Sequence, residues 1–142
     1  MHCSILIICR PNRLRIMSYL DKATPESIKN AIEAAELDLN FYLMEHNNVL
    51  DYYDANAKEH PWLATAICRK EGPNVQACPA SEFFEFTEEG EPFMILKDCI
   101  LYDSRDYDTW ETMEDELILD AIEEPITCNL DNWWFVVVDA HI

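Results

Sequence analysis

NWWFVVVDAHI, residues 132–142, contains a run of aromatic and β-branched side chains that favours a strand from Trp133 to Asp139. Because the run is wholly apolar, we expect a sheet covered on both faces, with Trp133 and Trp134 both in the core. The alternative is one outward tryptophan that anchors a partner. A second apolar run, SILIIC (4–9), stops at the turn-forming RPN (10–12) and predicts another buried strand.

Helix and strand signals follow one another along the rest of the chain. Thr24 before Pro25 and Glu26 predicts a helix start, and an apolar stripe at helical spacing continues to Ala57. A helix of that length would be unusual, so we expect a break near 38–40 or 47–48. Other expected strands are 13–20, 62–69 and two segments, 81–86 and 93–102, joined as a hairpin around Gly90.

This order of elements predicts a single α+β domain over residues 1–142. The sheet is expected to be mixed and mostly antiparallel, and two to three helices accompany it.

Charge is distributed very unevenly along the sequence. There are 28 Asp and Glu against 10 Lys and Arg, a net charge of -18. Residues 71–142 hold 19 of the acids and, as bases, only Lys97 and Arg105. Self-repulsion of this size costs stability, and an anionic surface repels both nucleic acid and anionic membranes. The expected partner is therefore a basic protein, with no direct nucleic-acid binding and no membrane binding.

The densest acidic segment is DTWETMEDELILDAIEEP (108–125), with eight carboxylates and no base. Asp108 and Glu111 suit the start of a helix, but acids near its end oppose the helix dipole, and each like-charge i, i+4 pair costs roughly 0.2–0.5 kcal/mol. One interpretation is a solvated helix face on an acidic protein. The other is a preformed anionic ridge for a basic groove. The residues predicted to bind a partner, with Tyr107 as aromatic anchor, are Asp103, Asp106, Tyr107, Asp108, Glu111, Asp115, Glu116, Asp120, Glu123 and Glu124.

The sequence carries no motif for catalysis or metal binding. Two glycines cannot build a phosphate-binding loop, and no cysteine pair has zinc-ligand spacing. The acids after Asp103 miss the EF-hand pattern. The four histidines are scattered, so a zinc site would have to be assembled from distant residues, and His46 on the apolar stripe is expected in the core. We therefore predict no catalytic residue, no metal and no cofactor.

The six cysteines lie largely in apolar runs, where a free thiol behaves as a small core residue. No secretory signal precedes them, and no stretch approaches the roughly 20 apolar residues of a membrane span. We expect reduced thiols and a cytoplasmic location; a fold built on disulfides is the alternative.

A small, acidic, single-domain chain without catalytic signature resembles, in general type, the bacterial toxin-immunity proteins. That resemblance implies a non-enzymatic inhibitor that occludes a basic partner such as a nuclease. The alternative is a nucleic-acid mimic of phage or plasmid origin that blocks restriction or another defence enzyme. Mimicry needs acids over an extended surface, and the near-neutral first half of the sequence favours a patch. A metal-dependent enzyme and an acidic subunit of a larger assembly are further alternatives.

Overall fold

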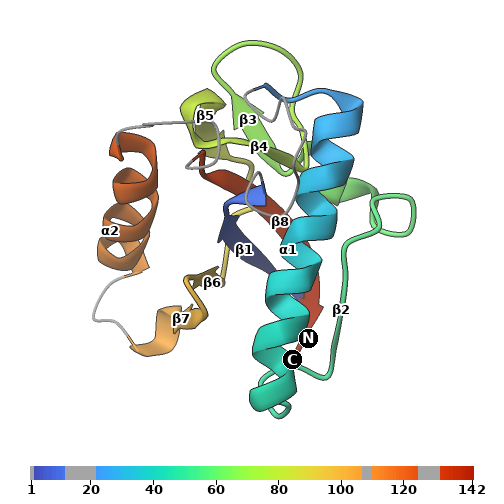
Figure 1. Ribbon diagram of the computed structural model, residues 1–142, viewed down its shortest axis with the longest axis vertical. Coiled ribbons are helices and arrows are strands. Elements are labelled where there is room, and N and C mark those ends of the chain that lie inside the picture. Colours follow the sequence, from blue (N-terminus) through green and yellow to red (C-terminus); the bar gives the residue numbers. More distant parts are fainter. Residues whose placement is uncertain (1, 12–21, 107–109, 125–131) are drawn as a thin grey trace.

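The computed structural model describes residues 2–11, 22–106, 110–124 and 132–142 (Figure 1). Within them a six-stranded sheet has the order β2–β8–β1–β6–β7, with β4 also paired to β8. The strands are β1 His2–Cys9, β2 Tyr52–Asp54, β4 Ala77–Pro79, β6 Met94–Lys97, β7 Ile100–Asp103 and β8 Trp134–His141. β1 and β6 run parallel and the other pairs are antiparallel. The predicted α+β fold with a mostly antiparallel mixed sheet is confirmed.

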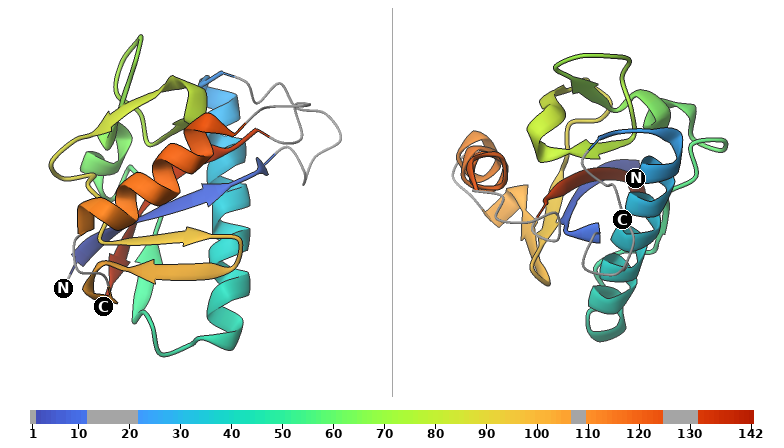
Figure 2. Two further views of the ribbon diagram at one scale, coloured as in Figure 1. Left: turned by 90° about the vertical axis from the view of Figure 1, so that its left-hand side faces the viewer. Right: turned by 45° about the horizontal axis from the view of Figure 1, so that its top comes forward.

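Two α-helices and a small second sheet cover the main sheet. α1 spans Pro25–Glu45 and α2 spans Trp110–Glu123, while β3 (Ile67–Arg69) pairs with β5 (Phe83–Phe86). Short 3-10 turns lie at Pro61–Thr65, Ala80–Glu82 and Ser104–Asp106. Figure 2 shows α1 and α2 on opposite sides of the main sheet.

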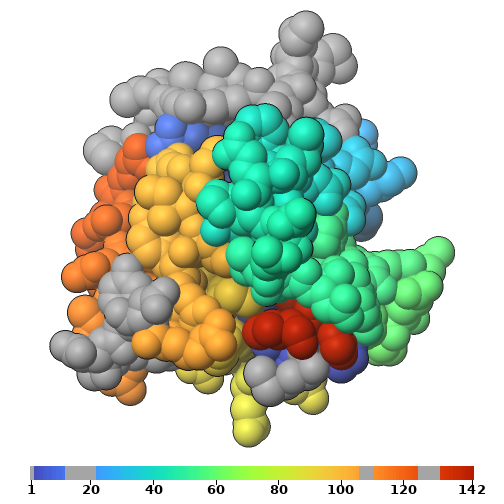
Figure 3. Space-filling view, turned by 90° about the horizontal axis from the view of Figure 1, so that it is seen from below, coloured from blue at the N-terminus to red at the C-terminus, as the bar shows by residue number. Residues whose placement is uncertain are grey.

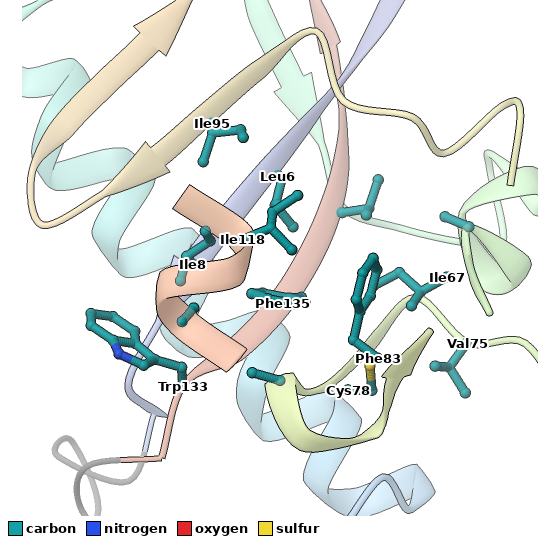
Figure 4. Close-up of a cluster of buried hydrophobic side chains, with 14 of the residues drawn as sticks. Leu6, Ile8, Ile67, Val75, Cys78, Phe83, Ile95, Ile118, Trp133 and Phe135 are labelled. Atoms are coloured by element: carbon teal, nitrogen blue, oxygen red, sulfur yellow. The ribbon is translucent and has the colours of Figure 1, made fainter. Parts of the chain in front are cut away.

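The central strands are buried on both faces, as their apolar runs predict. Side chains such as Ile7 and Val136 pack with α1, whereas Leu6 and Phe135 point to the other face, toward the small sheet and α2 (Figure 4). Trp134 belongs to the core between the sheet and α1, and 0% of its surface is exposed. Trp133 belongs to the core on the other face of the sheet, and 5% of its surface is exposed. The prediction that both tryptophans are core residues is confirmed.

The first helix starts where the sequence predicts. Thr24 caps it: its Oγ1 accepts a hydrogen bond from the Ser27 amide at 3.1 Å, and Ser27 Oγ accepts one from the Thr24 amide at 2.8 Å. The helix ends at Glu45, close to the second of the two predicted breaks. The prediction that the apolar stripe continues as helix to Ala57 is wrong, because the segment Tyr52–Asp54 is a strand that pairs with β8. His46, expected in the core, is exposed at the helix end and stacks on Tyr42.

Three strand predictions need correction or lie outside the described residues. Only the last part of 62–69 is a strand, because Pro61 starts a 3-10 turn. The hairpin around Gly90 does not form, since β5 pairs with β3 and β6 pairs with β1 and β7. The segment 93–102 instead contains a hairpin of its own, with β6 and β7 joined through Asp98 and Cys99. The strand expected at 13–20 lies outside the described residues.

Candidate functional site

A groove lies between the second helix and the small sheet, and we call it the α2–β5 groove. Its volume is about 400 Å³. Its lining residues are Phe83, Phe84, Glu85, Phe86, Glu91, Glu114, Asp115, Ile118, Leu119 and Ile122.

Both walls of the groove pack on the core that lies between the main sheet, the small sheet and α2. Phe83 meets Phe135 edge-on, with ring centroids 5.0 Å apart, which holds β5 against the main sheet. On the helix side, Met113, Ile118 and Ala121 are buried. Both walls therefore rest on rigid elements.

Large apolar side chains remain exposed in this groove. Phe84 is 64% exposed and Leu119 is 47% exposed. Phe84 belongs to the β5 wall and Leu119 to the α2 wall, so both walls carry exposed apolar surface that a partner can cover.

The groove is also strongly anionic. Its lining contributes four carboxylates, from Glu85, Glu91, Glu114 and Asp115, and includes no Lys or Arg. Glu88 and Glu89 are exposed in the adjoining loop between β5 and β6. Apolar anchors ringed by charge of one sign match the composition of a binding surface for a basic partner.

The predicted acids of the second helix are all exposed: Glu111, Asp115, Glu116, Asp120, Glu123 and Glu124. Asp115 lines the α2–β5 groove. Asp120, Glu123 and Glu124 lie instead around Arg10, Lys97 and Trp133.

Glu124 has a local explanation. Arg10 Nη2 donates to Glu124 Oε1 at 2.7 Å, and the indole N–H of Trp133 donates to Glu124 Oε2. Arg10 also stacks on the Trp133 ring, 3.8 Å from its centroid. These contacts connect the end of α2 to the residue that follows β1. Glu124, one of the acids that oppose the helix dipole, therefore has a structural role.

The predicted residues before α2 are held differently. Arg105 binds the Asp103 carboxylate through Nε and Nη2, the latter at 2.6 Å, and this hydrogen bonding keeps the pKa of Asp103 below its usual range. Asp103 therefore already has a cationic partner within the fold. The side chain of Asp106, and all of Tyr107 and Asp108, lie outside the described residues.

Sequence reasoning missed the β5 wall. The segment SEFFEF (81–86) combines Glu82 and Glu85 with three phenylalanines, but its sequence predicts only a strand. The same mixture of aromatic and acidic residues surrounds Tyr107, which is the predicted aromatic anchor. That signal could have marked Phe84 and Glu85, but pairing them with α2 needed the fold.

A second polar cluster lies at the β2 edge of the main sheet. Among the described residues, Asp54, Glu59 and His60 have ligand atoms within 4.8 Å of one another, the spacing expected of metal ligands. This cluster shares no residue with the α2–β5 groove.

The described cysteines are all free: Cys3, Cys9, Cys68, Cys78 and Cys99. Burial, and then the charge of Glu82, raise the pKa of Cys78 to about 12. Burial also raises the pKa of Cys9 well above its usual range. These two thiols stay protonated and act as core residues rather than nucleophiles.

Comparison with known proteins gives no relative: no family model, no curated protein and no solved structure matches the chain. Neither described helix combines the length and the apolar character that crossing a membrane requires.

Proposed function

We propose that this protein is a non-enzymatic inhibitor that binds and occludes a basic partner protein through the α2–β5 groove. The observation that supports this is the conjunction of exposed Phe84 and Leu119 with four groove carboxylates and no groove base. In kind, the proposal is an immunity protein that neutralises a bacterial toxin such as a nuclease in the cytoplasm.

The exposed apolar side chains would supply affinity. Fully burying an exposed Phe or Leu contributes roughly 1.5–3 kcal/mol, and hot spots cluster near the well-packed centre of an interface. A stable interface covers about 800 Å² on each partner, so the groove would be its centre. The exposed acids Glu111 and Glu116 on α2 would extend it as the rim.

The groove carboxylates would raise the association rate and would favour basic partners over others. A cationic surface relieves the mutual repulsion of Glu85, Glu91, Glu114 and Asp115, and long-range attraction raises the association rate. A nuclease site is basic because it holds phosphate. An anionic groove that covers such a site or its rim blocks substrate without any chemistry.

The test is a binding measurement with paired charge reversals. The candidate partner is the product of a neighbouring gene, purified beside several unrelated basic nucleases. The double variant Glu85→Lys, Asp115→Lys should weaken binding by more than about tenfold, as should Phe84→Ala. Glu26→Lys, Glu45→Lys on α1 changes the net charge equally and should leave affinity within about threefold.

Three outcomes would contradict the proposal. Equal losses in both double variants would show a response to net charge rather than to the groove. Broad, salt-sensitive inhibition of unrelated DNA enzymes would indicate the nucleic-acid mimic instead. Turnover of a substrate would show an enzyme.

A further inference from the structure

Two aspartates stand directly opposite each other where the sheet meets solvent. In the β2–β8 pairing, Asp54 is the register partner of Asp139, and Asp139 is only 1% exposed. Like charges in directly opposed strand positions are destabilising, and a buried carboxylate needs a cationic or hydrogen-bonding partner. This position therefore calls for positive charge.

The side chains that face these two carboxylates are imidazoles. His60 Nε2 lies 3.2 Å from Asp54 Oδ2 and 3.7 Å from Asp139 Oδ2. His2 Nδ1 lies 2.9 Å from the same oxygen of Asp139. Within the described residues, the ion pairs found for Asp54 and Asp139 are with histidines. A single ring nitrogen of His60 thus faces two carboxylates, although one N–H can serve only one of them well.

A third carboxylate completes the cluster. Glu59 places a ligand atom within 4.8 Å of those of Asp54 and His60.

The ligand atoms are held in place by local backbone structure. Asp54 Oδ1 accepts a hydrogen bond from the Asn56 amide at 2.8 Å, which leaves Oδ2 directed at His60. The amides of Glu59 and His60 both donate to the carbonyl of Asn56 at 3.1 Å, so a turn carries these two ligands back toward Asp54. Figure 3 views this end of the molecule, where the last residues of β8 lie beside the segment that carries β2.

We propose that Asp54, Glu59 and His60 bind one divalent transition-metal ion, with Zn²⁺ as the best-matched ion. One imidazole and two carboxylates are donors that Zn²⁺ accepts, and three protein ligands leave its fourth position for water. Ligands about 2.0–2.2 Å from a tetrahedral ion stand roughly 3.3 Å apart, which matches the separation of His60 Nε2 and Asp54 Oδ2. Mg²⁺ and Ca²⁺ prefer all-oxygen sites and fit the imidazole poorly.

Asp139 lies beside the proposed site. Its Oδ2 is 3.7 Å from the same His60 nitrogen that faces Asp54, and His2 Nδ1 lies 2.9 Å from that oxygen. His60 and Asp139 also line a pocket of about 430 Å³, which gives the ion a path from solvent. The proposal is independent of the inhibitor function, because the two sites share no residue.

The test is a titration of the tag-free full chain with ZnCl₂ in excess Mg²⁺, which occupies diffuse acidic sites. We expect calorimetry to give one bound ion per chain. When Co²⁺ replaces Zn²⁺, we expect the strong visible absorption bands that are typical of tetrahedral Co²⁺. His60→Ala and Glu59→Gln should each weaken binding by at least about tenfold. His46→Ala removes an exposed imidazole outside the cluster and should bind like the wild type.

Thermal unfolding gives a second measurement. Zn²⁺ should raise the melting temperature of the wild type and of His46→Ala, and should not raise that of Glu59→Gln, because only native ligand geometry binds the ion. Glu59 is exposed, so this variant keeps the fold even if His60→Ala does not. Binding without one-to-one stoichiometry would overturn the proposal. So would wild-type affinity in both His60→Ala and Glu59→Gln, or loss only in His2→Ala, which would place the ion on the neighbouring His2–His141 pair.

Discussion

Individual aspartates in this protein experience opposite environments. The carboxylate of Asp38 lies in a pocket between α1 and the β6–β7 turn, where loss of water, and then the charge of Asp98, raise its pKa. Asp103 is gripped by Arg105, whose hydrogen bonds lower its pKa. The same chemical group therefore weakens the fold at one position and strengthens it at the other.

Substituting these two residues should change stability in opposite directions. A raised pKa means that the ionised form of Asp38 is disfavoured in the fold. Because Asp38 is partly exposed, solvent screens this penalty, and Asp38→Asn should stabilise by no more than about 0.5 kcal/mol at pH 7. That gain should shrink as pH falls toward the ordinary aspartate range. Asp103→Asn should destabilise by about 0.5 kcal/mol at pH 7, because the stability of a group with lowered pKa is present above its unfolded pKa and is lost as pH falls.

Urea unfolding of both variants and the wild type between pH 7 and about pH 3 measures these differences, because the stability from Asp103 is lost below the ordinary aspartate pKa of about 3.9. Each variant serves as the control for the other. A gain for Asp38→Asn that stays constant with pH would show that the effect does not come from the carboxylate charge.

Helices and strands that are specified by a few neighbouring residues could be predicted from the sequence. The pairing of strands that lie far apart in the sequence could not. The capped start of α1 and the apolar runs of β1 and β8 carry their information within a few residues. The pairing of β5 with β3 does not, because neighbouring strands in sequence are only the commoner partners. The acidic helix could likewise be found from sequence, whereas the groove required knowing that β5 lies beside it.

The turn between β6 and β7 was missed for a different reason. Asp98 and Cys99 adopt φ angles of 51° and 62°, the backbone that a tight two-residue hairpin requires. Asp tolerates this conformation, but Cys rarely does. Because cysteine is unusual at such a position, the sequence of this apolar run does not indicate a turn at Asp98 and Cys99.

Cys99→Gly should stabilise the protein by about 1 kcal/mol, because glycine adopts positive φ without a steric penalty. Cys99→Ala keeps the Cβ atom and should change stability little. Chemical unfolding of both variants distinguishes the explanations. An equal gain for alanine would show that the exposed thiol, rather than the backbone, is responsible.

The described part of the molecule gathers acids on the α2 side of the sheet and at the β2 edge. The α2–β5 groove holds acids with no base in its lining, and the cluster around Asp54 adds more at the β2 edge. Arg10 and Arg105 neutralise acids elsewhere. The remaining repulsion acts over distances at which salt screens it.

Added NaCl should therefore stabilise the isolated protein. Raising ionic strength from about 0.01 M to about 0.5 M shortens the screening length from about 30 Å to below 10 Å. We expect a gain of about 1 kcal/mol, or about 3 °C in melting temperature. The variant Glu85→Lys, Asp115→Lys should start from a higher low-salt stability and gain less. A melting temperature independent of salt in the wild type would contradict this account of the charge.

Strand order has a consequence for how the chain matures on the ribosome. β8 is the last strand in sequence, yet it pairs with β1, β2 and β4 and forms the centre of the sheet. Until β8 emerges, β1 and its apolar side chains have neither their antiparallel neighbour nor a closed core. Nascent chains that lack β8 should thus be substrates for chaperones and proteases, and the native sheet can form only after β8 has been synthesised.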